Sequence, residues 1–173
     1  MLLHQYPDPV LRRKCQRVER FDEDLAAIAE QMFETMRENH GIGLAAPQAG
    51  MEIRVFVANV AGEEGGDEVF VNPEIISRSG TEVDEEGCLS FPGVFVKVHR
   101  AARITVRFQD LKGEVRETEA EGLRARCIQQ EVDHLEGRLL MDMMSPVQRI
   151  ANRRRLHELE QRFDEHSAET SAS

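Results

Sequence analysis

The middle of the chain alternates short apolar stretches with turn signals, and this pattern limits the fold more than any other feature. In Arg103–Gln109 apolar and polar residues alternate, as in a strand with one buried face. Asp110–Gly113 has the composition of a hairpin turn, and Glu114–Glu121 is the expected returning strand. Because strands joined by such short turns run antiparallel, the pattern predicts an antiparallel sheet rather than a parallel one.

Other strands are expected on either side of an acidic stretch. Ile53–Asn59 is rich in β-branched and apolar residues, which favours a strand. Ala61–Asp67 is expected to form a flexible turn, and Val69–Val71 a returning strand that stops at Pro73. Phe95–Val98 is a further short candidate.

Helices are expected at both ends of the chain. Apolar residues recur at helical spacing in the first of them, at Leu25, Ile28, Ala29, Met32, Phe33 and Met36. Asp22 or Asp24 can cap this helix. A second helix is expected over Leu123–Gly137, and a third begins at Ser145-Pro146, where a capping residue precedes proline. Helices separated from antiparallel strands indicate an α+β fold.

The length of 173 residues suits one domain, which we expect over residues 1–166. Residues 167–173 are expected to be a polar, disordered tail. No run of 18 apolar residues occurs, so a membrane span is not expected. The first residues lack the basic and apolar segments of a signal peptide. The three cysteines lie far apart without a Cys-x-x-Cys pair, which is typical of a reducing compartment and indicates the cytoplasm.

The charge balance excludes one class of partner. The 22 Lys and Arg residues against 32 Asp and Glu residues give a net charge of −10, which argues against a general or sequence-specific nucleic-acid binder. The stretch between positions 61 and 90 contains nine acidic residues and one basic residue, and a solvated face of loops is the favoured interpretation.

The first segment with chemical character is Gln130-Glu131-Val132-Asp133-His134 in the second expected helix. Residues 130 and 134 are four apart, so their side chains lie on one helical face. Two histidines at this spacing bind a catalytic divalent metal, with the neighbouring glutamate as general base. Here glutamine takes the first position. Taken alone, the segment fits surface or capping residues better than a metal site.

The second segment contains Cys88, within Glu85-Glu86-Gly87-Cys88-Leu89-Ser90. A lone cysteine of this kind is usually a small buried hydrophobic residue. It could also supply one thiolate to a metal site with an open fourth position. A third interpretation is a cysteine nucleophile with His134 as its base.

The third segment is the stretch from Gly41 to Gly50, with sequence GIGLAAPQAG. It fails the Gly-x-Gly-x-x-Gly spacing, because Ala46 stands three residues after Gly43, and no strand is expected before it. What remains is a tight backbone segment that carries an uncharged amide donor at Gln48. Such a donor can stabilise an oxyanion that forms on a carbonyl group.

Together the three segments resemble the peptide deformylases, a family whose members remove the formyl group from the N-terminal formyl-methionine of new polypeptides. The family pattern is Gly-x-Gly-Leu-Ala-Ala-x-Gln, Glu-Gly-Cys-Leu-Ser and His-Glu-x-x-His. This chain has GIGLAAPQ at 41–48, EGCLS at 86–90 and QEVDH at 130–134. The resemblance covers roughly residues 2–146 and implies short antiparallel strands packed around the motif-bearing helix, with further helices at both ends.

The resemblance also implies roles for individual residues. Cys88 and His134 would be ligands of one divalent metal, Fe²⁺ before Zn²⁺ or Ni²⁺, and Glu131 the general acid and base. Gln48 and the backbone N–H of Leu89 would stabilise the oxyanion. Three residues would contact the substrate: Ile42, Gly43 and Leu123.

Gln130 stands where the family has its first histidine ligand. An amide oxygen is neutral like imidazole but a poorer donor for these metals, so weaker metal binding is expected. Cys127 lies three residues earlier and could replace the missing ligand, although packing beside the site is the favoured interpretation. Three functions stay open: an active deformylase, a silent protein that binds formyl-methionine or methionine N-termini, and an inactivated variant of a working enzyme.

The last expected helix carries a basic run, Arg149 and Arg153–Arg155. A solvated face is the favoured interpretation, and contact with ribosomal RNA near emerging chains is the alternative.

Overall fold

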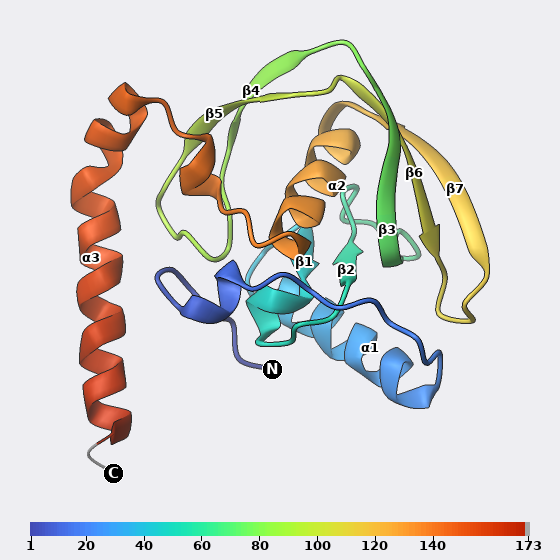
Figure 1. Ribbon diagram of the computed structural model, residues 1–173, viewed down its shortest axis with the longest axis horizontal. Helices are drawn as coiled ribbons and strands as arrows, with labels where there is room; N and C mark the ends of the chain where they lie inside the picture. Colours follow the sequence, from blue (N-terminus) through green and yellow to red (C-terminus); the bar gives the residue numbers. More distant parts are fainter. Residues whose placement is uncertain (172–173) are drawn as a thin grey trace.

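The structure, a computed structural model, describes residues 1–171 (Figure 1). Its α-helices are α1 (Glu23–Glu38), α2 (Gly122–Leu135) and α3 (Pro146–Ser171). Its strands are β1 (Gly43–Ala45), β2 (Val55–Ala58), β3 (Glu68–Ser79), β4 (Glu82–Glu86), β5 (Val96–Arg100), β6 (Arg103–Gln109) and β7 (Val115–Glu121). Short 3-10 helices cover Pro9–Arg12, Ala46–Ala49 and Leu140–Met143.

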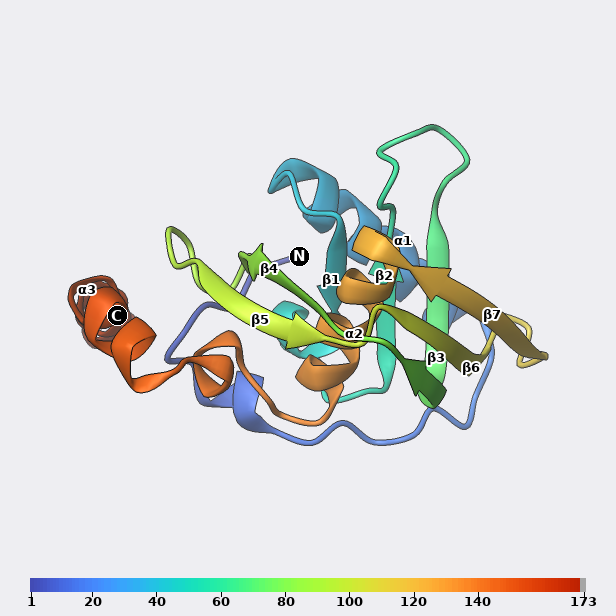
Figure 2. The ribbon, with the colours of Figure 1, turned by 90° about the horizontal axis from the view of Figure 1, so that it is seen from above.

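The strands form two antiparallel sheets. The larger has the order β1-β2-β3-β6-β7, and the smaller is the β4–β5 hairpin. Viewed from above, α2 lies between the larger sheet and this hairpin (Figure 2). The expected α+β fold, with antiparallel strands around the motif-bearing helix, is confirmed.

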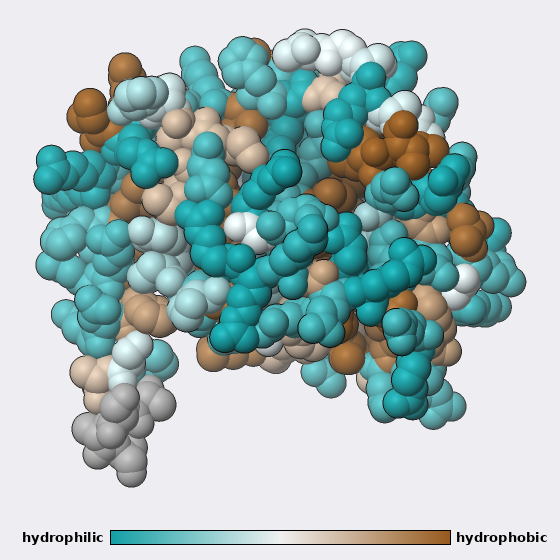
Figure 3. All heavy atoms as spheres, in the orientation of Figure 1, coloured by the Kyte–Doolittle hydropathy of each residue, from teal (hydrophilic) through white to brown (hydrophobic). Residues whose placement is uncertain are grey.

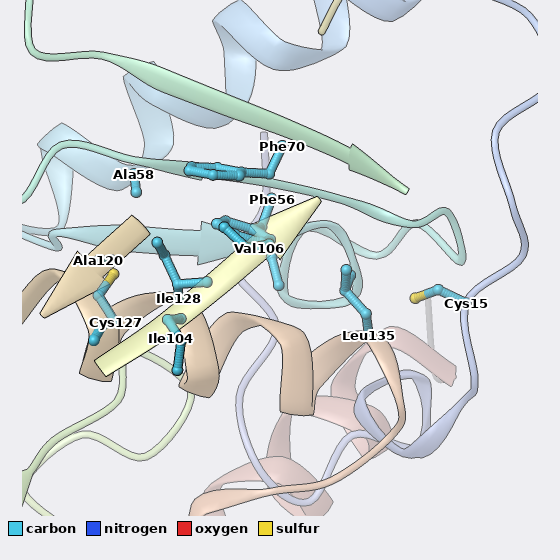
Figure 4. Packing of buried hydrophobic residues seen from close by; sticks show 12 residues of the cluster. Cys15, Phe56, Ala58, Phe70, Ile104, Val106, Ala120, Cys127, Ile128 and Leu135 are labelled. Atoms are coloured by element: carbon cyan, nitrogen blue, oxygen red, sulfur yellow. The ribbon is translucent and has the colours of Figure 1, made fainter. Parts of the chain in front are cut away.

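Strand β2 shows why the larger sheet has a helix on each face. Its residues are buried on both sides, as its apolar sequence predicts. Val55 and Val57 pack with apolar residues of α1, whereas Phe56 and Ala58 face the cluster that includes Ile128 of α2 (Figure 4). Alternation along the strand therefore places α1 and α2 on opposite faces.

The helix ends follow the expected chemistry. Asp22 accepts a hydrogen bond from the backbone N–H of Leu25 and so caps α1. At α3 the Ser145 side chain accepts from the N–H of Gln148, whose own side chain accepts from the N–H of Ser145. Helix α3 lies at the edge of the molecule in Figure 1.

The structure differs from the expected boundaries at the C-terminus. Helix α3 continues through Ser171, whereas residues 167–173 were expected to be a disordered tail. Helix growth adds one hydrogen bond for each added residue, so a helix that packs through Leu156 and Leu159 can extend beyond its packed part. Residues 172 and 173 lie outside the described residues.

Three strand predictions also need correction. Strand β3 does not stop at Pro73 but runs to Ser79, because a register shift between Val71 and Glu74 accommodates the missing N–H of proline. Strand β1 was not predicted as a strand, since three residues carry too little periodicity. Much of the acidic stretch is strand rather than loop: β4 and the end of β3 are largely solvent-exposed, so an alternating apolar pattern is absent there.

The surface is mostly hydrophilic on the face that Figure 3 shows, with scattered apolar patches. Among the described helices, none has both the length and the apolar character that crossing a bilayer requires.

A buried ion-pair network joins the β4–β5 hairpin to α2. The Glu86 carboxylate accepts hydrogen bonds from Arg100 Nε at 2.8 Å and from Arg126 Nη1 at 2.9 Å. Arg100 Nη1 also donates to Asp133 on α2 at 2.5 Å. The side chains of Glu86 and Arg100 are only 3% and 8% exposed, so these charges depend on one another for their solvation.

We predict that Arg100→Ala lowers the free energy of unfolding by about 3–5 kcal/mol, because it leaves Glu86 buried without its main partner. Urea denaturation at pH 7, followed by circular dichroism, measures this loss. Arg103→Ala is the matched control: its pair with Glu121 is largely exposed, so a change below about 1 kcal/mol is expected. Equal losses in the two variants would contradict the importance of the network.

Candidate functional site

The three chemically distinctive segments meet beside α2. Gln48 comes from the 3-10 helix after β1, Cys88 from the loop after β4, and His134 from α2. Cys88 Sγ lies 3.3 Å from His134 Nε2, and Gln48 Nε2 lies 3.6 Å from the same sulfur. Folding therefore brings together residues that are 46 and 40 positions apart in the chain.

The amide of Gln48 is held in one orientation. Its Oε1 accepts from the backbone N–H of Ala45 at 2.9 Å, so its Nε2 is the group that faces Cys88. The same nitrogen donates to Ser90 Oγ at 3.2 Å, and Ser90 in turn donates to the carbonyl oxygen of His4. Gln48 is 1% exposed, so it presents a fixed, dry hydrogen-bond donor at the site.

Glu131 and His134 are both buried on α2, at 3% and 1% exposure. Glu131 Oε2 and His134 Nδ1 have no hydrogen-bond partner among the described residues. Burial, together with the negative charge of Glu86, raises the pKa of Glu131 to about 8. Burial and the positive charge of Arg100 lower the pKa of His134 to about 4, so the imidazole is neutral at pH 7.

The thiol of Cys88 is also disfavoured as an anion. Burial and the nearby charge of Glu131 raise the pKa of Cys88 to about 12. A neutral imidazole with so low a pKa is a weak base for a thiol that holds its proton this strongly. The arrangement therefore disfavours the interpretation of Cys88 as a nucleophile activated by His134.

Gln130 lies beside Cys88, at the edge of the ion-pair network around Glu86. Its Nε2 donates to Glu86 Oε2 at 2.9 Å and to the carbonyl oxygen of Gly87 at 3.2 Å. Sequence reasoning missed the buried role of Glu86, because Glu85-Glu86 looks like part of the acidic surface. The signal that could have revealed it is the alternation in β5, which buries Arg100 on the same face as Val96 and Val98. A buried arginine needs an acidic partner, and Glu86 is that partner.

The donor chemistry fits a divalent transition metal at two positions. A cysteine sulfur and a neutral imidazole nitrogen that converge within 3.3 Å form a suitable pair, and the unpartnered Glu131 Oε2 is the kind of group that a cation or its water would satisfy. Within the described part of the chain, no three His, Cys, Asp or Glu side chains form a metal-binding group. Gln130 lies close to this pair, since its Nε2 donates to the carbonyl oxygen of Gly87, the residue before Cys88.

A cavity of about 430 Å³ opens beside these residues. Its lining includes the predicted substrate contacts Ile42, Gly43 and Leu123, which the structure brings together with Cys88, Leu89, Gln130 and Glu131. It also includes apolar residues that sequence reasoning did not single out, at Phe91, Val94 and Phe95. Such a lining suits an apolar side chain.

Gly43 lies against the catalytic candidates. A Cβ atom there would be 2.6 Å from Glu131 Oε1 and 2.8 Å from Cys127 Sγ, so a side chain at this position would displace at least one of these two residues. Cys127 lines the cavity, and its thiol faces the carbonyl oxygen of Ile42 at 3.8 Å. Cys127 is 6% exposed and belongs to the apolar cluster that includes Phe56 and Ile128, which favours a packing role.

Comparisons with known proteins point to one family. The family model described as polypeptide deformylase matches residues 1–150. A peptide deformylase of Thermotoga neapolitana is 46% identical over 155 residues, which cover 89% of this chain and 93% of the relative. One of Alkalilimnicola ehrlichii is 47% identical over 156 residues, or 89% and 87% of the two chains.

Solved structures show the same fold. A plant peptide deformylase superposes with a TM-score of 0.93 at 38% identity, covering 97% of this chain and 93% of that one. A peptide deformylase from Plasmodium falciparum superposes with a TM-score of 0.90 at 36% identity, covering 94% and 96%.

We predict that Cys88 in the folded, chelator-treated chain reacts with iodoacetamide at pH 8 at least about 100-fold more slowly than in urea, because burial suppresses its thiolate. Mass spectrometry of the cysteine peptides measures the rate at each position. The urea-unfolded chain is the control, where all three cysteines should react. Fast modification of Cys88 in the folded chain would contradict the raised pKa.

Proposed function

Because the chain belongs to the polypeptide deformylase family, we propose that it removes the formyl group from the N-terminal formyl-methionine of newly made polypeptides. The observation that carries the proposal is the grouping of four side chains around Cys88: Cys88 and Glu131 line one cavity, and Gln48 Nε2 and His134 Nε2 lie 3.6 and 3.3 Å from Cys88 Sγ. Water is the second substrate. The amide C–N bond breaks, and the products are formate and a free methionine amine.

A divalent cation held by Cys88 and His134, with Gln130 as the third side chain, would supply the positive charge that makes a water molecule acidic near neutral pH. We propose Fe²⁺ as this cation, with Zn²⁺ or Ni²⁺ as alternatives. A sulfur and an imidazole nitrogen suit these ions better than Mg²⁺ or Ca²⁺, and this preference supports the choice.

Glu131 is proposed as the general base and acid. It takes a proton from the attacking water and later returns it to the leaving amine, so no net proton is lost. Its pKa of about 8 supports both transfers, since a group whose pKa lies near the operating pH can accept and release a proton.

Gln48 and the backbone N–H of Leu89 are proposed as donors to the formyl oxygen when it becomes negatively charged. The fixed orientation of the Gln48 amide supports this role, because a donor that is already oriented pays no reorganisation cost as the charge forms. Ile42, Gly43 and Leu123 are proposed to contact the methionine end of the substrate, since they line the same cavity.

We place the activity in the cytoplasm, a choice that the three free cysteines support. A contact between the ribosome and Arg149 or Arg153–Arg155 stays second to a solvated helix face. The Arg154 side chain is 94% exposed and pairs with Glu158 on the same helix, as expected for a solvated helix face. Unchanged ribosome co-sedimentation of an Arg153→Glu variant would leave only the solvated face.

The proposed function is tested by formate release from a formyl-Met peptide with the metal-loaded chain. We expect Glu131→Gln to lower kcat/KM by about 10²–10⁴-fold, because a positioned general base contributes that much. Glu117→Gln, an exposed glutamate on β7 that pairs with Arg107, should leave the rate unchanged. Peptide binding without any formate release by the parent chain would contradict the proposal and favour the silent binding protein.

We also predict that Gly43→Ala lowers kcat/KM by about 10²-fold, because the new methyl group must displace Glu131 and a shift of about 1 Å at a reacting group has this effect. The urea midpoint is measured beside the rate, so that loss of folding is not mistaken for loss of geometry. Activity within about twofold of the parent chain would show that Glu131 moves freely, against the proposed close fit.

A further inference from the structure

The amide of Gln130 has only one orientation that satisfies its neighbours. Its two N–H groups face two acceptors, Glu86 Oε2 at 2.9 Å and the carbonyl oxygen of Gly87 at 3.2 Å. Neither acceptor can donate a hydrogen bond to the amide oxygen. Rotating the amide by 180° would place its oxygen against a carboxylate, so Nε2 is held there and Oε1 remains for another partner.

The group that holds this nitrogen is itself fixed. Glu86 is 4% exposed, and its Oε1 accepts from both Arg100 and Arg126. Its Oε2 accepts from Arg100 Nη2 at 3.0 Å as well as from Gln130. With both oxygens engaged by three side chains, the carboxylate has no freedom to follow a moving amide.

Gln130, whose Oε1 remains free, lies beside the two proposed metal ligands Cys88 and His134. Gln130 precedes His134 by one helical turn on α2, and its hydrogen-bond acceptor Gly87 immediately precedes Cys88. Gln130 and Cys88 line the same cavity, and Cys88 Sγ lies 3.3 Å from His134 Nε2. An amide oxygen is an accepted ligand of divalent ions, although a harder one than imidazole nitrogen.

We propose that Glu86 is a positioning residue that makes Gln130 an oxygen ligand: by holding Nε2 it leaves Oε1 to join Cys88 Sγ and His134 Nε2 around a divalent cation. The site would then use sulfur, nitrogen and oxygen from three different side chains. The proposal rests on the proposed function in taking this cation to be the one that serves hydrolysis.

The first test is Co²⁺ binding to the chelator-stripped chain. Thiolate charge-transfer absorption detects the bound ion, and competition with a chelator of known affinity gives the dissociation constant. We expect Gln130→Leu, which has a similar size and no donor, to bind Co²⁺ at least about 10-fold more weakly than the parent. Gln130→His should bind at least about 10-fold more tightly. Equal affinity of the parent and Gln130→Leu would overturn the proposal.

The second test needs no substitution. In the parent chain, labelled with ¹³C and ¹⁵N, saturating Zn²⁺ should shift the Gln130 Cδ resonance, because coordination withdraws electron density from the carbonyl group. The Nε2 protons should stay in slow exchange, since Glu86 and Gly87 still accept them. An unchanged Cδ resonance at saturation would exclude Oε1 as a ligand.

The role of Glu86 is tested with Glu86→Gln in two backgrounds. We expect at least about a 10-fold loss of Co²⁺ affinity when Gln130 is present, and no further loss in the Gln130→Leu background, because Glu86 acts through Gln130. Asp133→Asn is the matched control: Asp133 also pairs with Arg100, but its ion-pair partners are Arg100 and Arg138 and not Gln130. Equal losses in both backgrounds, or an equal loss in the control, would show a purely structural role and overturn the proposal.

If Glu86→Gln does not fold, the resonance experiment on the parent decides the proposal by itself. Formate release is measured separately on every folded variant. A parent that binds Zn²⁺ through Oε1 and releases no formate would refute the proposed function and keep this inference. A parent that is active while Gln130→Leu binds Co²⁺ equally well would refute this inference and keep the proposed function.

Discussion

The buried carboxylate of Glu86 is the interaction on which the rest of the site depends. It lies at the end of β4, and its partners Arg100 and Arg126 come from β5 and α2. A buried charge without a partner is costly, so the hairpin cannot separate from α2 without exposing or stranding these ions. Since Cys88 follows Glu86 by two residues, the same ion pairs set where the sulfur lies relative to His134.

Helix α2 supplies the other half of the geometry. It carries Gln130, Glu131 and His134 within little more than one turn, and the large sheet and α2 share the apolar cluster around Phe56 and Ile128 (Figure 4). Packing of this kind fixes a helix more firmly than its own backbone hydrogen bonds. The apolar core and the buried ions therefore determine one arrangement together: the core holds the helix, and the ions bring the loop with Cys88 to it.

Much of the fold could be predicted because local chemistry and packing agree there. The alternation in Arg103–Gln109 and the turn at Asp110–Gly113 both recur in the structure as β6 and its hairpin to β7. Strand β4 could not be found, because four of its five residues are exposed and leave no apolar pattern. The motifs named Gln48, Cys88, Glu131 and His134, but spacing along the chain cannot show that Cys88 and His134 come within 3.3 Å. Glu86 was missed because its partners are distant in sequence.

A comparison of glutamine with histidine explains how position 130 can differ from the family motif. A neutral imidazole has one N–H and one nitrogen lone pair, and an amide has an N–H on one side and oxygen lone pairs on the other. Either group can therefore donate to Glu86 while it offers a lone pair elsewhere. The amide has a second N–H, which an imidazole lacks, and here the carbonyl oxygen of Gly87 accepts it. A leucine would lose the donor and the lone pair alike, and a glutamate would set two carboxylates against each other. Of these side chains, only glutamine and histidine keep a donor towards Glu86 and a lone pair for a cation.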